Sequence, residues 1–154
     1  MTLLVRSPVA GTVVPVADVP DPVFAEGMVG PGTAVEPAEP SDGRAVAPLD
    51  GHLVTLHPHA CVVQSDGGQA VLVHLGIDTV RLGGKGFTVH VREGDPVRTG
   101  DLLVEWDPAA VRDRGLSALC PVVVLEAAAE DVRLTAPPGT EVAAGDPLLE
   151  LGGR

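Results

Sequence analysis

Short hydrophobic runs separated by glycine, proline and aspartate predict a chain built mainly from strands and tight turns. Residues 94–105 (GDPVRTGDLLVE) align with residues 139–150 (GTEVAAGDPLLE) at a constant offset of 45. A weaker copy occupies residues 29–36, and residues 7–13 resemble residues 47–53. Each long copy contains a turn, a short strand, a Gly-Asp turn and a second strand. The repeats predict near-duplication of a small β unit and are too few and uneven for a solenoid.

Helix signals are confined to two short segments. Asp107 is suited to cap a helix that has Pro108 as its first residue and ends at Gly115. Residues 21–27 carry the same start and stop signals over a single turn. The pattern therefore predicts an all-β fold, a compact antiparallel β-sandwich or barrel with internal near-duplication and one or two very short helices.

The composition fits one such domain. The chain has 154 residues, enough to bury a core, and we expect residues 1–154 to form a single domain. Its 26 valines, 19 glycines and 15 prolines favour strands and tight turns over helices. Two cysteines are too few for a disulfide framework.

The charge excludes several classes of partner. A net charge of −11 would repel nucleic acids and anionic membrane surfaces. One Trp, two Phe and no Tyr leave little on which single-stranded bases could stack. The N-terminus does not resemble a signal peptide, and no apolar stretch approaches the roughly 18 residues of a membrane span. We therefore expect a cytoplasmic protein with no direct membrane insertion.

The most informative segment contains two histidines on neighbouring predicted strands. Apolar runs flank residues 66–69 (DGGQ), a strong hairpin signal, and a two-residue turn would pair Cys61 with His74. His59 lies two residues from Cys61 and would therefore share a face with His74 as its diagonal neighbour. Diagonal Cβ atoms lie about 7–8 Å apart, which lets two imidazoles point their tips together. Apolar residues on both faces predict a central place for this hairpin in the sandwich.

Residue types and spacing alone leave three interpretations of these histidines open. They fit partly buried structural histidines that bond to backbone groups. Two adjacent neutral imidazoles also suit phosphoryl transfer, one as the nucleophile and the other as a donor to the charged oxygens. Finally, the H-x-H pair of His57 and His59, with the H-x3-D pair of His74 and Asp78, has the chemistry of a zinc ligand set.

A longer motif around His74 resembles that of a known family. Residues 73–80 (VHLGIDTV), followed by residues 85–87 (KGF), strongly resemble the phosphorylation-site signature of glucose-class enzyme IIA of the bacterial sugar phosphotransferase system. Several motifs in the right order, over most of the chain, make this resemblance specific. The further matching blocks are residues 18–26, 30–32, 46–51, 59–60 and 117–123.

The resemblance implies a phosphotransferase component that acts as a phosphocarrier in sugar uptake. It implies that His74 accepts phosphate and that His59 is the accessory histidine. It also implies that phosphate arrives from phospho-HPr and leaves to the IIB domain of a membrane sugar permease. The family's fold is a compact antiparallel β-sandwich, and the transfer needs no cofactor. Two histidines are an incomplete ligand set for zinc, so we expect zinc only at an interface with a partner. We also expect a monomer, and the sugar is not encoded here because sugar contacts lie in the permease.

Supporting and docking residues are expected around the same motif. We expect Gly76 and Asp78 to support the site, together with His57. His57 stands where the family commonly has a Thr that fixes the tautomer of the accessory ring. An apolar collar around the histidines would exclude water and dock both partners. The expected members of this collar are Val23, Phe24, Leu72 and Leu75.

Two other families share parts of this pattern. The alternative function is a zinc metallohydrolase of lysostaphin-like architecture, which uses H-x3-D and H-x-H ligand pairs. In that family H-x3-D comes first and H-x-H lies far downstream, the reverse of the order in this chain. Biotin and lipoyl carrier domains share the Gly-Asp hairpin repeat, but the only lysine, Lys85, lacks the flanking residues of a modified lysine.

Overall fold

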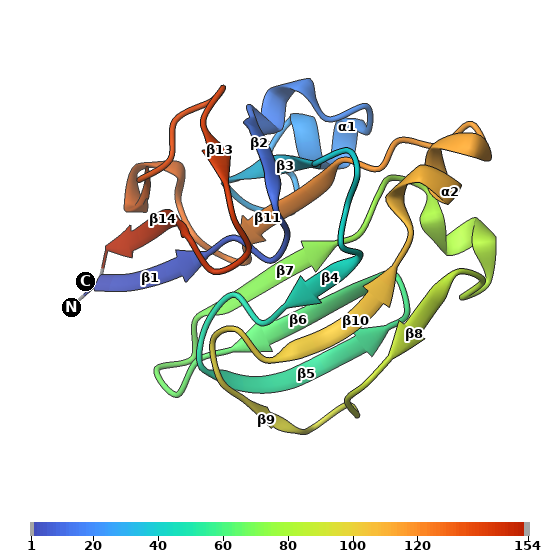
Figure 1. Ribbon diagram of the computed structural model, residues 1–154. Coiled ribbons are helices and arrows are strands. Elements are labelled where there is room, and N and C mark those ends of the chain that lie inside the picture. Colours follow the sequence, from blue (N-terminus) through green and yellow to red (C-terminus); the bar gives the residue numbers. More distant parts are fainter. Residues whose placement is uncertain (1, 153–154) are drawn as a thin grey trace.

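Antiparallel strands are the main regular elements of the computed structural model, which describes residues 2–152 (Figure 1). They form an eight-stranded sheet and two three-stranded sheets. Across the large sheet the order is β13 (Glu141–Val142), β2 (Gly11–Val14), β3 (Gly32–Pro37), β11 (Cys120–Val124), β7 (Ala70–His74), β6 (Ala60–Gln64), β5 (Gly51–His57) and β9 (Pro96–Val97). The smaller sheets have the orders β1 (Thr2–Arg6), β14 (Pro147–Gly152), β12 (Val132–Leu134), and β4 (Arg44–Val46), β10 (Leu102–Trp106), β8 (Phe87–Val89). The predicted all-β antiparallel fold is confirmed.

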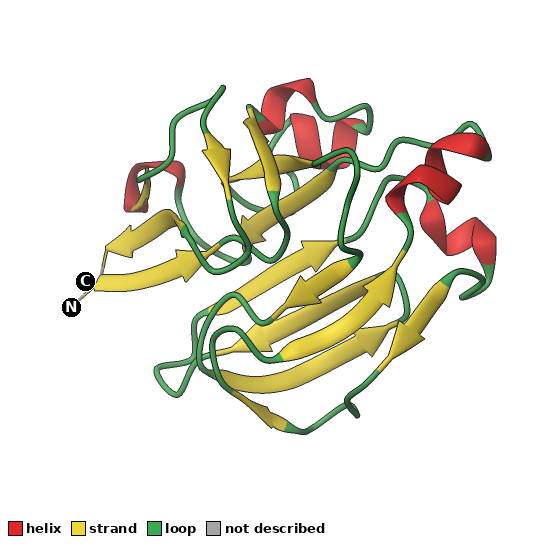
Figure 2. Ribbon diagram, viewed as in Figure 1, coloured by secondary structure: helices red, strands yellow, loops and turns green. Residues whose placement is uncertain are grey.

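The helices are short and stand where the capping signals predicted them (Figure 2). In α2 (Pro108–Asp113) the Asp107 carboxylate accepts hydrogen bonds from the first free backbone amides, at 3.0 and 3.2 Å. In α1 (Pro22–Ala25) the Asp21 carboxylate caps the chain in the same way. Three single-turn 3₁₀ helices complete the set: η1 (Val16–Asp18), η2 (Thr79–Leu82) and η3 (Ala129–Asp131).

The internal repeat corresponds to a repeated path between sheets. In both copies the short strand (β9 or β13) lies at an edge of the large sheet, and the following strand (β10 or β14) enters a small sheet. The turn between them is the same, because the Asp101 carboxylate accepts from the Arg98 amide at 2.9 Å and the Asp146 carboxylate accepts from the Ala143 amide at 2.8 Å. The predicted near-duplication is therefore present in three dimensions.

Two hydrophobic clusters fill the interior. The main cluster draws residues from all three sheets, including Val5 of β1, Ala45 of β4 and Leu53 of β5. A second, smaller cluster contains Phe24 of α1 and Ile77, with Leu72 packed against it. This second cluster anchors two segments of the chain. Phe24 lies three residues after Asp21, and Ile77 lies three residues after His74.

The β6–β7 hairpin has a register one residue away from the predicted one. Ala60 lies opposite His74, where the sequence had predicted Cys61. The Ser65 amide donates to the Gln69 carbonyl at 2.8 Å across a loop that spans residues 66–68. Gly68 in this loop has φ +91°, a conformation that allows the three-residue loop in place of the predicted two-residue turn. The hairpin does occupy the centre of the large sheet, as predicted.

Candidate functional site

Four rings form a continuous row at one end of β5 and β7. We define the ring row as His57, His59, His74 and Phe24. His57 stacks on His59 with the ring centroids 5.6 Å apart and the planes 21° from parallel. His59 meets His74 edge-on at 5.2 Å, and His74 meets Phe24 edge-on at 5.6 Å. The predicted proximity of His59 and His74 is therefore present in the structure.

His59 reaches His74 by a route that strand alternation did not anticipate. His57 pairs with Ala60 across the β5–β6 hairpin, so Pro58 and His59 form the turn and His59 lies outside β6. The Leu75 amide donates to the His59 carbonyl at 2.7 Å and ties this turn to the end of β7. The face-sharing argument for His59 is wrong, because a turn residue does not follow the period of a strand.

The tautomer of His74 follows from one hydrogen bond. Nδ1 of His74 lies 2.5 Å from the carbonyl oxygen of Gly76. A carbonyl oxygen only accepts, so Nδ1 carries the proton and Nε2 keeps its lone pair. The following backbone is fixed as well, because the Thr79 hydroxyl donates to the Leu75 carbonyl at 2.7 Å and the Ile77 amide donates to the Ser117 carbonyl at 2.9 Å.

Both imidazoles of the central pair are neutral at pH 7. Burial lowers the pKa of His59 from its usual 6.5 to about 4, with smaller contributions from His74 and His57. Burial also lowers the pKa of His74, while the Gly76 carbonyl and the carboxylates of Asp21 and Asp78 act in the opposite direction. The site therefore holds an uncharged nucleophilic nitrogen, on a ring beside one carbonyl and two carboxylates that individually favour positive charge.

The residues expected to support the site lie close to it. Gly76 has φ +79°, and a Cβ built there would lie 2.6 Å from Thr79 Cγ2. Asp78 is exposed, has φ 60° and precedes η2. The sequence predicts Asp21 only as a helix cap, because its effect on His74 depends on how α1 packs against β7.

The expected apolar collar is only partly at the surface. Val23 is 44% exposed, and Leu72 is half-buried. Phe24 is 7% exposed and contacts His74 from below the surface. Leu75 is 3% exposed and belongs to the main core, so its expected place on a docking surface is wrong. Val80 of η2 is 62% exposed and offers apolar surface within the motif of residues 73–80, but it was not among the expected collar residues.

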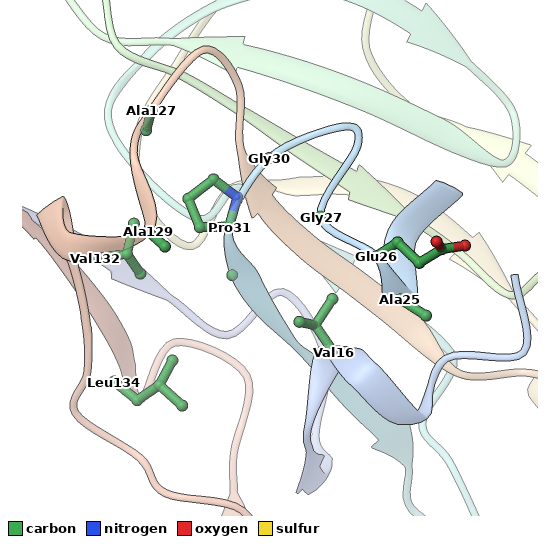
Figure 3. Close-up of a pocket in the computed structure, with 11 residues that line it drawn as sticks. Val16, Ala25, Glu26, Gly27, Gly30, Pro31, Ala127, Ala129, Val132 and Leu134 are labelled. Atoms are coloured by element: carbon green, nitrogen blue, oxygen red, sulfur yellow. The ribbon is translucent and has the colours of Figure 1, made fainter. Parts of the chain in front are cut away.

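The ring row is distinct from the apolar groove shown in Figure 3. That groove has a volume of about 500 Å³ and lies between residues near α1 and η3, among them Ala25, Pro31 and Ala129. Glu26 is the only ionisable residue among the described residues that line it, and no histidine is among them.

Two further properties bear on function. Among residues 2–152, no group of three or more His, Cys, Asp or Glu side chains is arranged to hold a metal ion. No helix in the same part of the chain is long and apolar enough to cross a membrane.

Paired neutral imidazoles, one of them with a free ring nitrogen, define a site of the class that transfers phosphoryl groups by way of a histidine nucleophile. A family model described as phosphoenolpyruvate-dependent sugar phosphotransferase system, EIIA 1, matches residues 3–130. The chain belongs to this family, the glucose-class enzyme IIA. It is a phosphotransferase component with a phosphocarrier role in the sugar phosphotransferase system.

Individual relatives agree with this assignment. The chain is 45% identical over 123 residues to the PTS system glucose-specific EIIA component of Halalkalibacterium halodurans, covering 79% of this chain and 69% of that protein. It is 40% identical over 124 residues to the same component of Oceanobacillus iheyensis, covering 79% and 73%. The solved structure of the glucose permease IIA from Mycoplasma capricolum superposes with a TM-score of 0.87 at 34% identity, over 97% of this chain and 96% of that one. The zinc-hydrolase alternative gains no support from these comparisons.

The low pKa of His59 predicts that acid destabilises the fold. Between pH 6.5 and about 4 the unfolded chain protonates this histidine and the folded chain does not, so the free energy of unfolding falls as the pH is lowered through this window. His59→Gln should show a smaller fall than the wild type, measured by urea unfolding at pH 7 and pH 5. Histidine ring signals in NMR should give His59 a titration midpoint near 4. A midpoint above 6 would contradict the burial argument.

Gly76→Ala should disturb the site from its backbone. The left-handed conformation costs a non-glycine residue about 1–2 kcal/mol, and the new Cβ would also lie 2.6 Å from Thr79 Cγ2 and 2.9 Å from the Ser117 carbonyl. Gly115 is a matched control because it has φ +78° and no atom within 4 Å of its built Cβ. In chemical denaturation, Gly76→Ala should lower the free energy of unfolding more than Gly115→Ala. Equal losses would show that the close approach at Gly76 is unimportant.

Proposed function

We propose that His74 accepts a phosphoryl group on Nε2 from phospho-HPr and passes it to the IIB domain of a sugar permease. The Nδ1–H hydrogen bond to the Gly76 carbonyl carries this proposal, because it leaves Nε2 as the nucleophile. In the first step the Nε2 lone pair forms a bond to phosphorus. The N–P bond of the HPr phosphohistidine breaks, and its electron pair returns to the HPr ring. A cysteine thiolate of IIB then attacks the same phosphorus, and the electron pair of the N–P bond returns to Nε2.

The surroundings of His74 support the charge that this step creates. An imidazole that carries a proton on Nδ1 and phosphorus on Nε2 is a cation. The Gly76 carbonyl, Asp21 and Asp78 all favour the positively charged ring. These groups would therefore stabilise the phosphorylated ring, although burial keeps the free ring neutral.

His59 is proposed as the donor to the phosphoryl oxygens. Its ring centroid lies 5.2 Å from that of His74, and its backbone is held by the Leu75 amide. A neutral imidazole carries one N–H, and a donor that is already in place needs no reorganisation during the transfer. His59 would thus stabilise the transferred group without taking part in bond formation.

The exposed rim of the site suits two successive partners. Val23 and Leu72 provide apolar surface near the ring row, with Phe24 packed beneath them. We propose that HPr and the IIB domain dock here in turn and exclude water from the phosphohistidine. The names of the relatives make a glucose-type permease the first IIB partner to test.

The proposed setting is the cytoplasm, where HPr and the IIB domain would meet this protein as a monomer. We propose that residues 1–154 act as one enzyme IIA domain, which is supported by a main core drawn from all three sheets. The transfer needs no cofactor, because phosphoryl transfer depends mainly on alignment and charge stabilisation. Zinc would bind only where a partner supplies further ligands, since His59 and His74 are an incomplete set.

Replacing His74 should abolish phosphorylation. Incubation with enzyme I, HPr and phosphoenolpyruvate should add one phosphate to the wild type, detected by intact-mass measurement, and none to His74→Ala. The phosphate should be labile in acid and stable in base, as expected for a nitrogen-linked group. His90→Ala is a matched control, because His90 is exposed and pairs with Glu105 outside the ring row. Phosphate retained by His74→Ala would contradict the assignment.

Replacing His59 should separate the two steps. His59→Gln keeps an amide donor, so His74 should still accept phosphate from phospho-HPr. The flexible glutamine side chain does not hold its amide in the position of the imidazole N–H. Onward transfer to IIB should therefore slow by roughly 10²–10³-fold, the usual cost of losing a positioned donor. Stopped-flow transfer from the purified phosphoprotein to a IIB domain measures this rate. If His59→Gln transferred phosphate to IIB at the wild-type rate, His59 would have only a structural role.

A further inference from the structure

His57 occupies an unusual position for an exposed strand residue. It is the last residue of β5 and is exposed, yet its ring lies flat against His59. We propose that His57 is a positioning residue, whose stacked ring holds the His59 imidazole edge-on to His74. Its effect on phosphoryl transfer rests on the proposed function, whereas the stacking itself does not.

The backbone of His59 is fixed, but that alone does not orient its ring. The Leu75 amide bonds to the His59 carbonyl at 2.7 Å, which holds the main chain. Rotation of an imidazole about the Cβ–Cγ bond has a broad energy profile, so the ring plane needs contacts of its own. His57 supplies such a contact on the ring face, 21° from parallel, and His74 meets the ring at 66°. Together the two contacts define one ring plane.

His57 is itself well anchored for this task. It pairs with Ala60 in the hairpin, and the preceding Leu56 amide donates to the Glu93 carboxylate at 3.0 Å. Pro58 follows with a restricted φ, and a Cβ built on Gly84 would lie 3.4 Å from Pro58 Cγ. The backbone on both sides of His57 is therefore constrained, and the ring stacks from a fixed base.

The form of the contact decides which side chains could replace His57. A stacked aromatic ring acts through its flat face, so any aromatic side chain of similar size should preserve the orientation of His59. If His57 acted by hydrogen bonding to His59, a glutamine amide at position 57 should instead preserve the orientation of His59. Because His57 is exposed, removing its ring leaves the buried core intact, and the variants should fold.

The experiment compares His57→Ala, His57→Phe and His57→Gln, with His52→Ala as a control from an exposed position on the same strand. The first measurement is the NMR ring-proton shifts of His59 in the unphosphorylated protein. We expect the ring-current shift from residue 57 to disappear in His57→Ala and His57→Gln and to persist in His57→Phe. His52→Ala should match the wild type.

The second measurement is the rate of phosphoryl transfer from the phosphorylated variants to a glucose-type IIB domain. We expect a roughly three- to tenfold slower rate for His57→Ala and His57→Gln, the scale of one aromatic contact, and a rate near that of the wild type for His57→Phe. Unchanged His59 shifts in His57→Ala would overturn the proposal. A slow His57→Phe beside a normal His57→Gln would also overturn it, in favour of a hydrogen bond.

The two measurements distinguish a failure of this proposal from a failure of the proposed function. If the wild type did not accept phosphate on His74, the proposed function would be wrong, and the ring-proton shifts would still decide whether the His57 ring stacks on His59. If His74 accepts phosphate but His57→Ala transfers it at the wild-type rate, the positioning role is wrong and the phosphocarrier assignment stands.

Discussion

The chemistry of this site depends on the hydrogen bond between Nδ1 of His74 and the carbonyl of Gly76. It assigns the proton to one ring nitrogen and leaves the other as a nucleophile. The bond requires the chain to turn immediately after β7, which Gly76 permits with φ +79°. The side-chain bond of Thr79 to the Leu75 carbonyl then holds that turn in place. The tautomer and the orientation of the imidazole are thus products of local backbone geometry.

The second half of the site comes from a different turn, and the large sheet brings the two together. His59 lies in the β5–β6 hairpin turn, and adjacent pairing of β6 with β7 places it beside His74. Its burial keeps it uncharged at pH 7, so it does not repel positive charge on the His74 ring. Phe24 closes the other side of His74 from the second hydrophobic cluster.

Local sequence signals predicted much of this architecture, and long-range packing supplied the rest. Valine-rich runs predicted the all-β fold, aspartate caps predicted both short helices, and the 45-residue offset predicted the near-duplication. The hairpin register was wrong because residues 66–69 are compatible with loops of two lengths, and only Gly68 at φ +91° distinguishes them. The pair of His59 and His74 was still found, since both turns lie at the same end of neighbouring strands. The burial of Leu75 and the effect of Asp21 on His74 depend on contacts between distant segments, which spacing does not encode.

The phosphocarrier role depends on one nitrogen atom, Nε2 of His74. Long-range ¹H–¹⁵N NMR of the protein after phosphorylation by phospho-HPr, with ³¹P detection, identifies the ring nitrogen that carries phosphorus. We predict phosphorus on Nε2 of His74, with the proton retained on Nδ1 and still bonded to the Gly76 carbonyl. Phosphorus on Nδ1, or on any residue other than His74, would contradict the account.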